Sequence, residues 1–354
     1  MSMLELQIGG KSVALARMVL RERRPPPPRI SLDVKPQYLR WEIGHYKDRL
    51  SFGPGGRGRA RRWIPDRVSE QHNLVLDNAY ELTARYGFLA LNNYAAVGTG
   101  TTAPTTSDKT LAAEVARTNA VPAGEQDALT RVSDGVYDQQ RVREFSATQV
   151  GGRNLGEWGF SPESVSGSQL AVKELFRDGS GQPVVLTLDQ DQSLRLIYTI
   201  RIQLAPVTAQ TVSIALTNLG TLTGKFLLTL GNPSYEKDDI HFIDEFARGY
   251  STIYNYAILH DIALSTSYDD SQYQNWKARV NYTLQDYVAG SRQRRTDTIV
   301  FDQSIIGDFL TFGLGWYYGT NNLKNQAPAR VVLDSALTKD NLHKLIFDPW
   351  TLAW

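Results

Sequence analysis

Hydrophobic and polar residues alternate along much of this chain, most regularly between Ser193 and Leu204. Apolar side chains occupy every second position from Leu194 onwards, and Arg195 and Arg201 are among the polar side chains between them. A period of two places these two sets on opposite faces of an extended strand. The pattern therefore predicts a long amphipathic β-strand with one buried face.

Shorter runs of strand-forming residues recur before and after that segment, and turn signals such as Asp134-Gly135 and Gly151-Gly152 separate them. Short strands with few helical periods between them favour an antiparallel β-sandwich over a parallel α/β sheet. We expect residues 68–232 to form such a sandwich. Its further predicted strands are residues 85–91, 141–150, 169–176, 183–188, 211–217 and 225–230.

The pattern changes after residue 233. Ile243, Phe246 and Tyr250 are spaced by three and four residues, which predicts a helix despite Gly249. Strand-like runs then resume, so we expect residues 233–354 to be a mixed, β-rich C-terminal region with at least one helix. The predicted strands of this region are residues 278–288, 298–301, 310–318 and 330–333.

Residues 1–67 follow neither pattern. Four consecutive prolines, Pro25–Pro28, force an extended backbone without hydrogen-bond donors, and residues 51–62 combine flexible glycines with arginines. Neither stretch contains enough apolar surface to fold alone. We therefore predict that residues 1–67 are an extended basic arm that becomes ordered by docking on something else.

Charge is distributed unevenly between this arm and the rest of the chain. Residues 1–67 contain 15 Lys and Arg against 6 Asp and Glu, a net charge of +9 in a chain whose total is +1, so residues 68–354 carry −8. Arginine pairs bidentately with carboxylate and phosphate, so the arginines form either a solvated tail or a site for an anionic partner. The candidate partner-binding residues of the arm are Arg21, Arg23, Arg24, Arg57, Arg59, Arg61 and Arg62.

Nucleic acid is a lesser alternative for that anionic partner. The sequence has no zinc-finger spacing and no aromatic RNA-recognition motif, so we do not expect sequence-specific binding. Electrostatic contact of the arm with nucleic acid is kept as an alternative.

Composition excludes several kinds of chemistry. Hydrophobic residues make up 42% of the chain and charged residues 21%, which is enough apolar material for a buried core. The chain has no cysteine, so disulfides, thiolate metal sites and cysteine nucleophiles are excluded. No apolar run approaches the roughly 20 residues of a membrane-spanning helix, and we expect no membrane insertion.

No motif of an enzyme or cofactor site stands out. Residues 98–104 lack the third glycine of a dinucleotide fingerprint, and residues 220–226 are one residue short for a P-loop. The acidic residues and histidines between Asp238 and Asp261 lack a metalloprotease or calcium-loop spacing, and a helix start explains such acidic residues. No G-x-S-x-G element accompanies a histidine. We therefore expect no catalytic activity, no cofactor and no metal.

Several short motifs follow one another between residues 73 and 205. Residues 98–104 read G-T-G-T-T-A-P, residues 108–114 read D-x-x-L-x-x-E, and a strand around Glu157 comes later. This series resembles that of structural proteins in the virions of tailed bacteriophages. Glu174 departs from the pattern, because the family tends to have a basic residue at or near this position.

The resemblance covers a little over a third of the chain and implies a scaffold, not a chemical site. It implies a non-enzymatic structural component of the virion, located in the tail, baseplate, neck or fibre-attachment region. We expect such a protein to dock on other virion proteins through its N-terminal arm. Because phage attachment structures are generally rotationally symmetric, we also expect a homo-oligomer, with three copies as the first expectation.

The motif residues also have a physical interpretation of their own. Gly98 and Gly100 permit a sharp reversal through positive φ, and Ser107 or Asp108 then caps a short helix. Glu157 is either a buried carboxylate that accepts backbone N–H groups or a solvent-facing residue, and the sequence leaves both open.

Aromatic residues supply an alternative function. The chain has seven Trp and seventeen Tyr, and an exposed set of them would form a glycan-binding face. The alternative is therefore a tail protein that binds the host surface or degrades its polysaccharide. The residues behind it are Trp276, Tyr317, Tyr318, Trp350 and Trp354.

Three large aromatic residues, Phe347, Trp350 and Trp354, lie in the apolar segment 345–354. Burying one such side chain is worth about 1.5–3 kcal/mol, so the three together would anchor an interface between subunits. The same segment would equally satisfy them by packing on its own domain, and the sequence leaves both open. These three residues complete the candidate partner-binding set.

Overall fold

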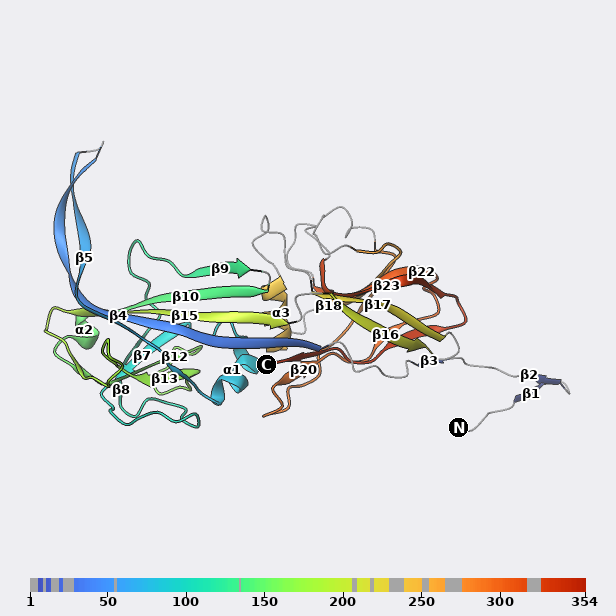
Figure 1. Ribbon diagram of the computed structural model, residues 1–354, viewed down its shortest axis with the longest axis horizontal. Coiled ribbons are helices and arrows are strands. Elements are labelled where there is room, and N and C mark those ends of the chain that lie inside the picture. Colours follow the sequence, from blue (N-terminus) through green and yellow to red (C-terminus); the bar gives the residue numbers. More distant parts are fainter. Residues whose placement is uncertain are drawn as a thin grey trace.

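The computed structural model is an elongated molecule with groups of β-sheets at its two ends (Figure 1). Helices α1 (Asn78–Tyr86) and α3 (Asp239–Arg248) lie between these groups, and the C-terminus lies beside them. The structure describes residues 6–8, 11–13, 19–21, 29–53, 56–133, 135–205, 209–216, 220–228, 239–249, 255–264, 276–316 and 326–354.

The largest sheet has seven strands and lies mainly at one end of the molecule. Strand β4 (Arg29–Gly53) lies in its middle, with β15 (Ser193–Ala205) antiparallel on one side. Its other side pairs with β25 (Thr351–Ala353) at the start of β4 and with β5 (Gly56–Gln71) further along. The remaining strands are β10 (Val136–Phe145) and β9 (Ala128–Ser133) beyond β15, and β20 (Gln293–Arg295) beyond β25.

A five-stranded antiparallel sheet lies beside this one, and aromatic side chains connect the two. Phe160 stacks on Tyr198 of β15 with ring centroids 4.7 Å apart, and Trp158 contacts the same ring edge-on. Trp41 of β4 meets Phe176 in the same way. The strands, in order across the sheet, are β6 (Leu74–Val75), β13 (Val172–Leu175), β12 (Glu157–Ser161), β7 (Tyr94–Gly98) and β8 (Glu114–Thr118).

Two small elements complete this end of the molecule. Strand β11 (Asn154–Leu155) pairs with β14 (Leu186–Thr187). Helix α2 (Ala147–Val150) follows β10 and begins with a capping box between Ser146 and Gln149.

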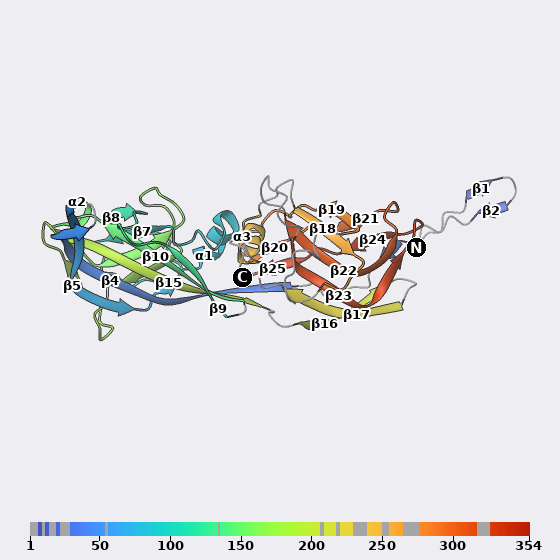
Figure 2. The ribbon, with the colours of Figure 1, turned by 90° about the horizontal axis from the view of Figure 1, so that it is seen from above.

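A six-stranded antiparallel sheet dominates the other end. Its strands are β16 (Gln210–Leu216), β17 (Gly220–Leu228), β23 (Gln326–Lys339), β22 (Gly307–Trp316), β18 (Asn255–His260) and β19 (Ala278–Asn281). A three-stranded sheet packs against it and consists of β21 (Ile299–Phe301), β24 (Lys344–Phe347) and β3 (Val19–Arg21). Beyond these sheets, β1 (Leu6–Ile8) and β2 (Lys11–Val13) form a separate two-stranded hairpin (Figure 2).

The structure confirms a mainly β chain in which antiparallel pairing predominates, although β25 pairs with β4 and β24 with β3 in parallel. The long strand predicted from Ser193 is β15. The predicted helix is also present, but α3 ends at Arg248 and buried strand β18 follows. Gly249, which adopts a φ of 70°, allows the chain to leave the helix there. The strand predicted at residues 85–91 is wrong, because α1 occupies the start of this range and buries Leu82 and Ala84.

The boundary of the predicted arm also needs correction, because residues 29–53 and 56–67 belong to strands β4 and β5. Ile30, Leu32, Leu39, Trp41 and Ile43 on β4 are all buried in the main core. The glycines, prolines and arginines of the whole range 1–67 outweighed this local alternation in the sequence analysis. Among the described residues of the predicted arm, β1, β2 and β3 belong to other sheets than the seven-stranded one.

Candidate functional site

Four of the predicted partner-binding arginines lie on a ribbon that projects from the large sheet (Figure 1). β4 pairs with β15 up to Gly44 and continues to Gly53 paired with β5 alone. We call residues 45–53 and 56–64, which pair with each other, the basic ribbon. Arg57, Arg59, Arg61 and Arg62 all lie on its β5 strand. Arg21 lies on β3 at the other end of the molecule, and Arg23 and Arg24 lie outside the described residues.

A cluster of charged and aromatic side chains holds the base of the basic ribbon. Arg195 lies over the ring of Trp63, with its guanidinium carbon 4.1 Å from the centroid. It also donates hydrogen bonds to Glu144 at 2.7 Å and to the hydroxyl of Tyr46 at 2.8 Å. Burial raises the pKa of Tyr46, whose hydroxyl in turn donates to Glu144. Trp63 Nε1 donates to Glu42 at 2.8 Å, so both ribbon strands are tied to the body.

Further polar contacts hold β5 at the base of the ribbon. His45 and Asp66 are 3.0 Å apart, and Gln192 donates to the same Asp66 oxygen at 3.0 Å. The hydrogen bond with His45 holds the pKa of Asp66 below its usual value. Arg67 donates to the carbonyl oxygen of Thr187. These contacts fix the direction in which the ribbon leaves the sheet.

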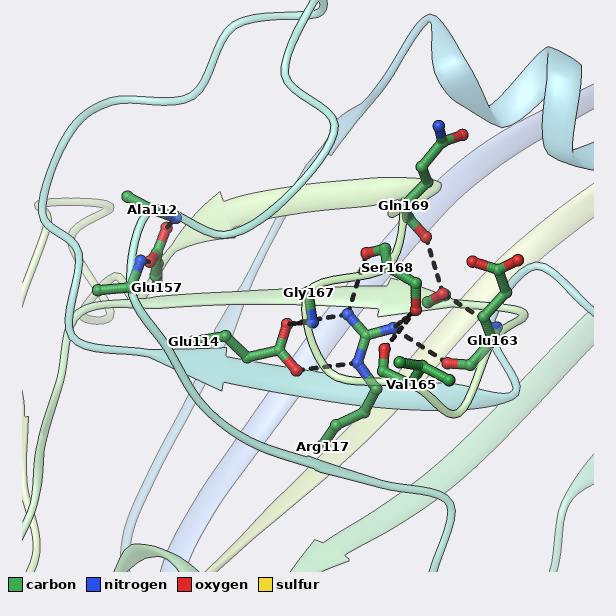
Figure 3. Close-up of polar contacts among 11 residues, drawn as sticks. Ala112, Glu114, Arg117, Glu157, Glu163, Val165, Gly167, Ser168 and Gln169 are labelled. Atoms are coloured by element: carbon green, nitrogen blue, oxygen red, sulfur yellow. Dashed lines mark hydrogen bonds and ion pairs between the residues drawn. The ribbon is translucent and has the colours of Figure 1, made fainter.

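A second polar centre lies around Glu157, which is completely buried (Figure 3). Its carboxylate accepts the backbone N–H groups of Ala112 and Ala113 at 3.1 and 2.9 Å. Lys173 Nζ lies 3.5 Å from the same carboxylate and forms a 2.9 Å ion pair with Asp108. The buried alternative for Glu157 is therefore correct, and its role is to hold the loop that precedes β8.

Glycines 98 and 100 serve this centre, but not through positive φ. Neither belongs to the glycines with positive φ. A Cβ at Gly98 or Gly100 would lie 2.7 or 2.4 Å from Glu157 Oε1, so the absence of a side chain allows the carboxylate to approach. The helix expected after Asp108 is also wrong, because the chain instead enters strand β8 at Glu114.

Arg117 organises the neighbouring loop (Figure 3). It forms two hydrogen bonds with Glu114 at 2.9–3.0 Å and donates to the carbonyl oxygens of Glu163 and Ser168. Glu114 also accepts the N–H of Gly167 at 3.0 Å. Burial alone would raise the pKa of Glu114, but the bonds from Arg117 and Gly167 lower it below its usual value. Residues three positions apart are neighbours on a helix but not on a strand, so the sequence did not indicate the pair of Glu114 and Arg117 on β8.

The charged motif residues therefore bind their own scaffold. Asp108 pairs with Lys173, Glu114 pairs with Arg117, and Glu157 accepts backbone N–H groups. Among the described residues, no group of three or more His, Asp or Glu side chains is arranged to hold a metal ion.

A small cavity of about 100 Å³ lies between β4, α1, β15 and Trp354. Apolar side chains such as Leu32, Leu91 and Ile200 form much of its lining. Asp33 is the one carboxylate among the lining residues, so the lining does not provide a pair of acidic groups.

The three aromatic residues of segment 345–354 contact the rest of their own chain. Phe347 stacks on Phe312 with ring centroids 3.5 Å apart, and Trp350 is 2% exposed. Trp354 stacks on Tyr287, and its indole N–H donates to the carbonyl oxygen of Tyr80 at 3.1 Å. Of the two alternatives left open, the structure shows packing on the chain itself, which removes the reason to expect a partner-binding patch there.

The same contacts weaken the glycan-binding alternative. Trp350 is buried and Trp354 is half-buried with one stacked neighbour, so they do not form an open aromatic face. Trp276 is half-buried and packs on a small cluster that contains Tyr256 and Leu264. Tyr317 and Tyr318 lie outside the described residues.

Comparisons with known proteins add no further assignment. No helix among the described residues is long and apolar enough to cross a membrane. No protein-family model, curated protein or solved structure matches this chain.

Proposed function

We propose that this chain is a non-enzymatic structural component of a bacteriophage virion that joins neighbouring subunits, as a tail, baseplate or fibre-attachment adaptor. The observation that carries the proposal is the β1–β2 hairpin, which lies apart from the sheets at one end of the molecule (Figures 1 and 2). An isolated two-stranded hairpin is marginally stable at best in water. A neighbouring protein that receives the hairpin stabilises it by adding a strand or a covering surface.

The hairpin offers two means of attachment. In the described part of the chain, β1 and β2 pair with each other and with no third strand, so each has a free edge. A free edge accepts a strand from another protein through backbone hydrogen bonds. The sequence Leu6–Ile8 also supplies apolar residues at alternate positions. The docking role expected for residues 1–67 is thus proposed here for the segment before β3.

The motif series supports a scaffold role in this proposal. Glu157 and Arg117 form hydrogen bonds with backbone groups of nearby loops, and Lys173 forms an ion pair with Glu157. Such contacts engage these charged groups in holding loops of the scaffold in place. This agrees with what the resemblance to virion structural proteins implies.

A truncation tests the proposal. A variant without residues 2–18 retains β3, which pairs in parallel with β24, and every strand of the larger sheets. We expect it to fold with an unchanged melting temperature but to be missing from purified particles. The matched control replaces Lys11, in the same hairpin, with Gln and should be incorporated normally. Normal incorporation of the truncated protein would contradict the proposal.

A further inference from the structure

The basic ribbon concentrates the positive charge of the molecule. Residues 45–64 contain six Lys and Arg and one Asp, a net charge of +5 where the whole chain carries +1. The rest of the chain therefore carries −4. Lys47, Arg61 and Arg62, whose side chains the structure describes, are exposed. Arg61 has an ion pair with Asp48 at 3.9 Å, and both of these side chains are more than half exposed.

The strand register assigns the basic residues to positions on both faces of the ribbon. Arg57, Arg59 and Arg61 occupy alternate positions of β5 and therefore share one face. Arg62 is on the opposite face, directly across from Lys47. Alternate residues of a strand are about 6.6 Å apart, so the basic positions of each face follow one another along the backbone of the ribbon.

The base of the ribbon does not neutralise these basic residues. Three carboxylates contact the base of the ribbon, and each already has a partner there. Glu42 binds Trp63, Glu144 binds Arg195, and Asp66 binds His45. The ribbon is thus a rigidly based, positively charged extension of two strands. It lies at the opposite end of the molecule from the β1–β2 hairpin (Figure 2).

A groove with phosphate on both walls fits this distribution better than a flat acidic surface does. A two-stranded ribbon enters the major groove of duplex DNA, which is about 12 Å wide, and phosphates line both of its sides. A flat acidic protein surface would meet the cations of one face alone. Arginine also binds phosphate bidentately.

We propose that the basic ribbon binds double-stranded nucleic acid through its phosphates, without reading sequence. This partner goes beyond the attachment to other subunits through the β1–β2 hairpin and does not depend on it. Nucleic acid was the lesser alternative for the anionic partner on the basis of the sequence alone. The structure adds the placement of the arginines on one projecting element.

Binding of a fluorescent duplex of mixed sequence to the full chain, measured by anisotropy across a salt series, tests the proposal. We expect a linear fall of log K with log salt concentration. Replacing Arg57, Arg59 and Arg62 with Gln should weaken binding about tenfold or more at about 100 mM salt. It should also make the slope shallower by about 3, because each lost phosphate contact changes the slope by about 0.9.

Two further variants control for charge and for folding. The first replaces three exposed cations of the body, Lys109, Arg153 and Arg295, with Gln and should retain duplex affinity. The second joins Asp48 to Arg61, which face each other across the ribbon, through an Asn-Gly turn. It removes residues 49–60, keeps the base cluster and should lose binding while its melting temperature stays the same.

Three outcomes would overturn the proposal. One is equal weakening by the body variant and the ribbon variant. Another is tight binding of poly-glutamate without binding of the duplex, which would assign the ribbon to an acidic protein surface. The third is tighter binding of a single strand than of the duplex, which would exclude recognition of a groove.

Discussion

Two buried carboxylates, Glu157 and Asp244, have different partners for their charge and different roles. Glu157 is fully buried but receives two backbone N–H groups and a nearby lysine. Asp244 on α3 accepts the N–H of Leu89 at 2.9 Å and pairs with Arg248 at 3.0 Å. Burial nevertheless raises the pKa of Asp244 to about 6. The first carboxylate organises a loop, whereas the second connects α3 to the segment after α1.

Replacing Glu157 with Gln should destabilise the protein by about 2–4 kcal/mol. The amide has one acceptor oxygen for two N–H groups, and its own NH₂ group would face one of these donors. Urea denaturation measures the change. Glu70→Gln, at an exposed position on β5, is the control and should change stability by less than about 0.5 kcal/mol. An equal effect of both substitutions would exclude a special role for Glu157.

Asp244 should make the protein more stable as the pH falls. Its pKa is raised from 3.8 to about 6, so between these values the folded chain holds a proton that the unfolded chain lacks. Stability should therefore increase as the pH falls from about 7 to about 5. Asp127 and Glu114, whose pKa values are lowered, lose their contributions only at lower pH.

Urea midpoints of the wild type and of Asp244→Asn across this pH range measure that dependence. The Asn variant should show a flatter profile, while a Gln substitution at the neighbouring Glu245 should retain the rise. His241, Arg248 and Glu245 also act on the carboxyl, so the comparison with Glu245 isolates the buried group. A rise of the same size in Asp244→Asn would assign it to other residues.

At the scale of elements, local alternation predicted strands better than composition did. The regular pattern from Ser193 gave β15 almost to the residue. β4 shows equally regular burial at Leu39, Trp41 and Ile43, but prolines and arginines on both sides of it indicated an arm. The pairing of β4 with β15 joins residues 149 to 174 positions apart, and no local pattern reveals such a partner.

The contacts around Glu157 could likewise not be predicted from local sequence patterns. The G-T-G-T-T-A-P turn and Glu157 were both recognisable, yet their close approach was not, because it joins segments separated by more than 50 residues. The glycines indicated a turn with positive φ, whereas tertiary packing against Glu157 explains them. The sequence therefore identified the two glycines and Glu157, and the fold shows that the glycines leave room for the Glu157 carboxylate.

Substitutions on paired strands test the integration of β4. Ile43→Ala should cost about 2–5 kcal/mol, because Ile43 is completely buried in the main core. Val68→Ala on the adjacent strand β5, where Val68 is 45% exposed, should cost less than about 0.5 kcal/mol. Guanidinium denaturation followed by tryptophan fluorescence compares the two. Equal and small losses would show that β4 is the docked arm that its composition indicated.

At the scale of the whole molecule, the proposed homo-oligomer must form without the aromatic segment 345–354 as its interface. This segment includes most of β24 and all of β25, and Leu345, Trp350 and Leu352 are buried within the chain. Deleting it should therefore unfold the protein, not merely dissociate subunits. Circular dichroism with light scattering would distinguish a folded monomer, which contradicts this expectation, from an unfolded or aggregated chain.

Light scattering of the intact protein also tests the expected symmetry. A three-fold assembly would have three times the 39.6 kDa mass of the chain. Removing residues 2–18 should reduce this to the mass of one chain if the β1–β2 hairpin joins identical subunits. Loss of particle incorporation with an unchanged oligomer would instead assign the hairpin to a different virion protein.

The continuity of β4 has a mechanical consequence. Its 25 residues run from the middle of the molecule to the tip of the ribbon, and thirteen of them are matched in register with antiparallel β15. A force that pulls the ribbon away along β4 would slide the two strands past each other. All hydrogen bonds of the ladder would then bear the load together, whereas a force that peels a strand sideways breaks them one at a time. The ribbon end of the molecule is therefore suited to resist tension along β4.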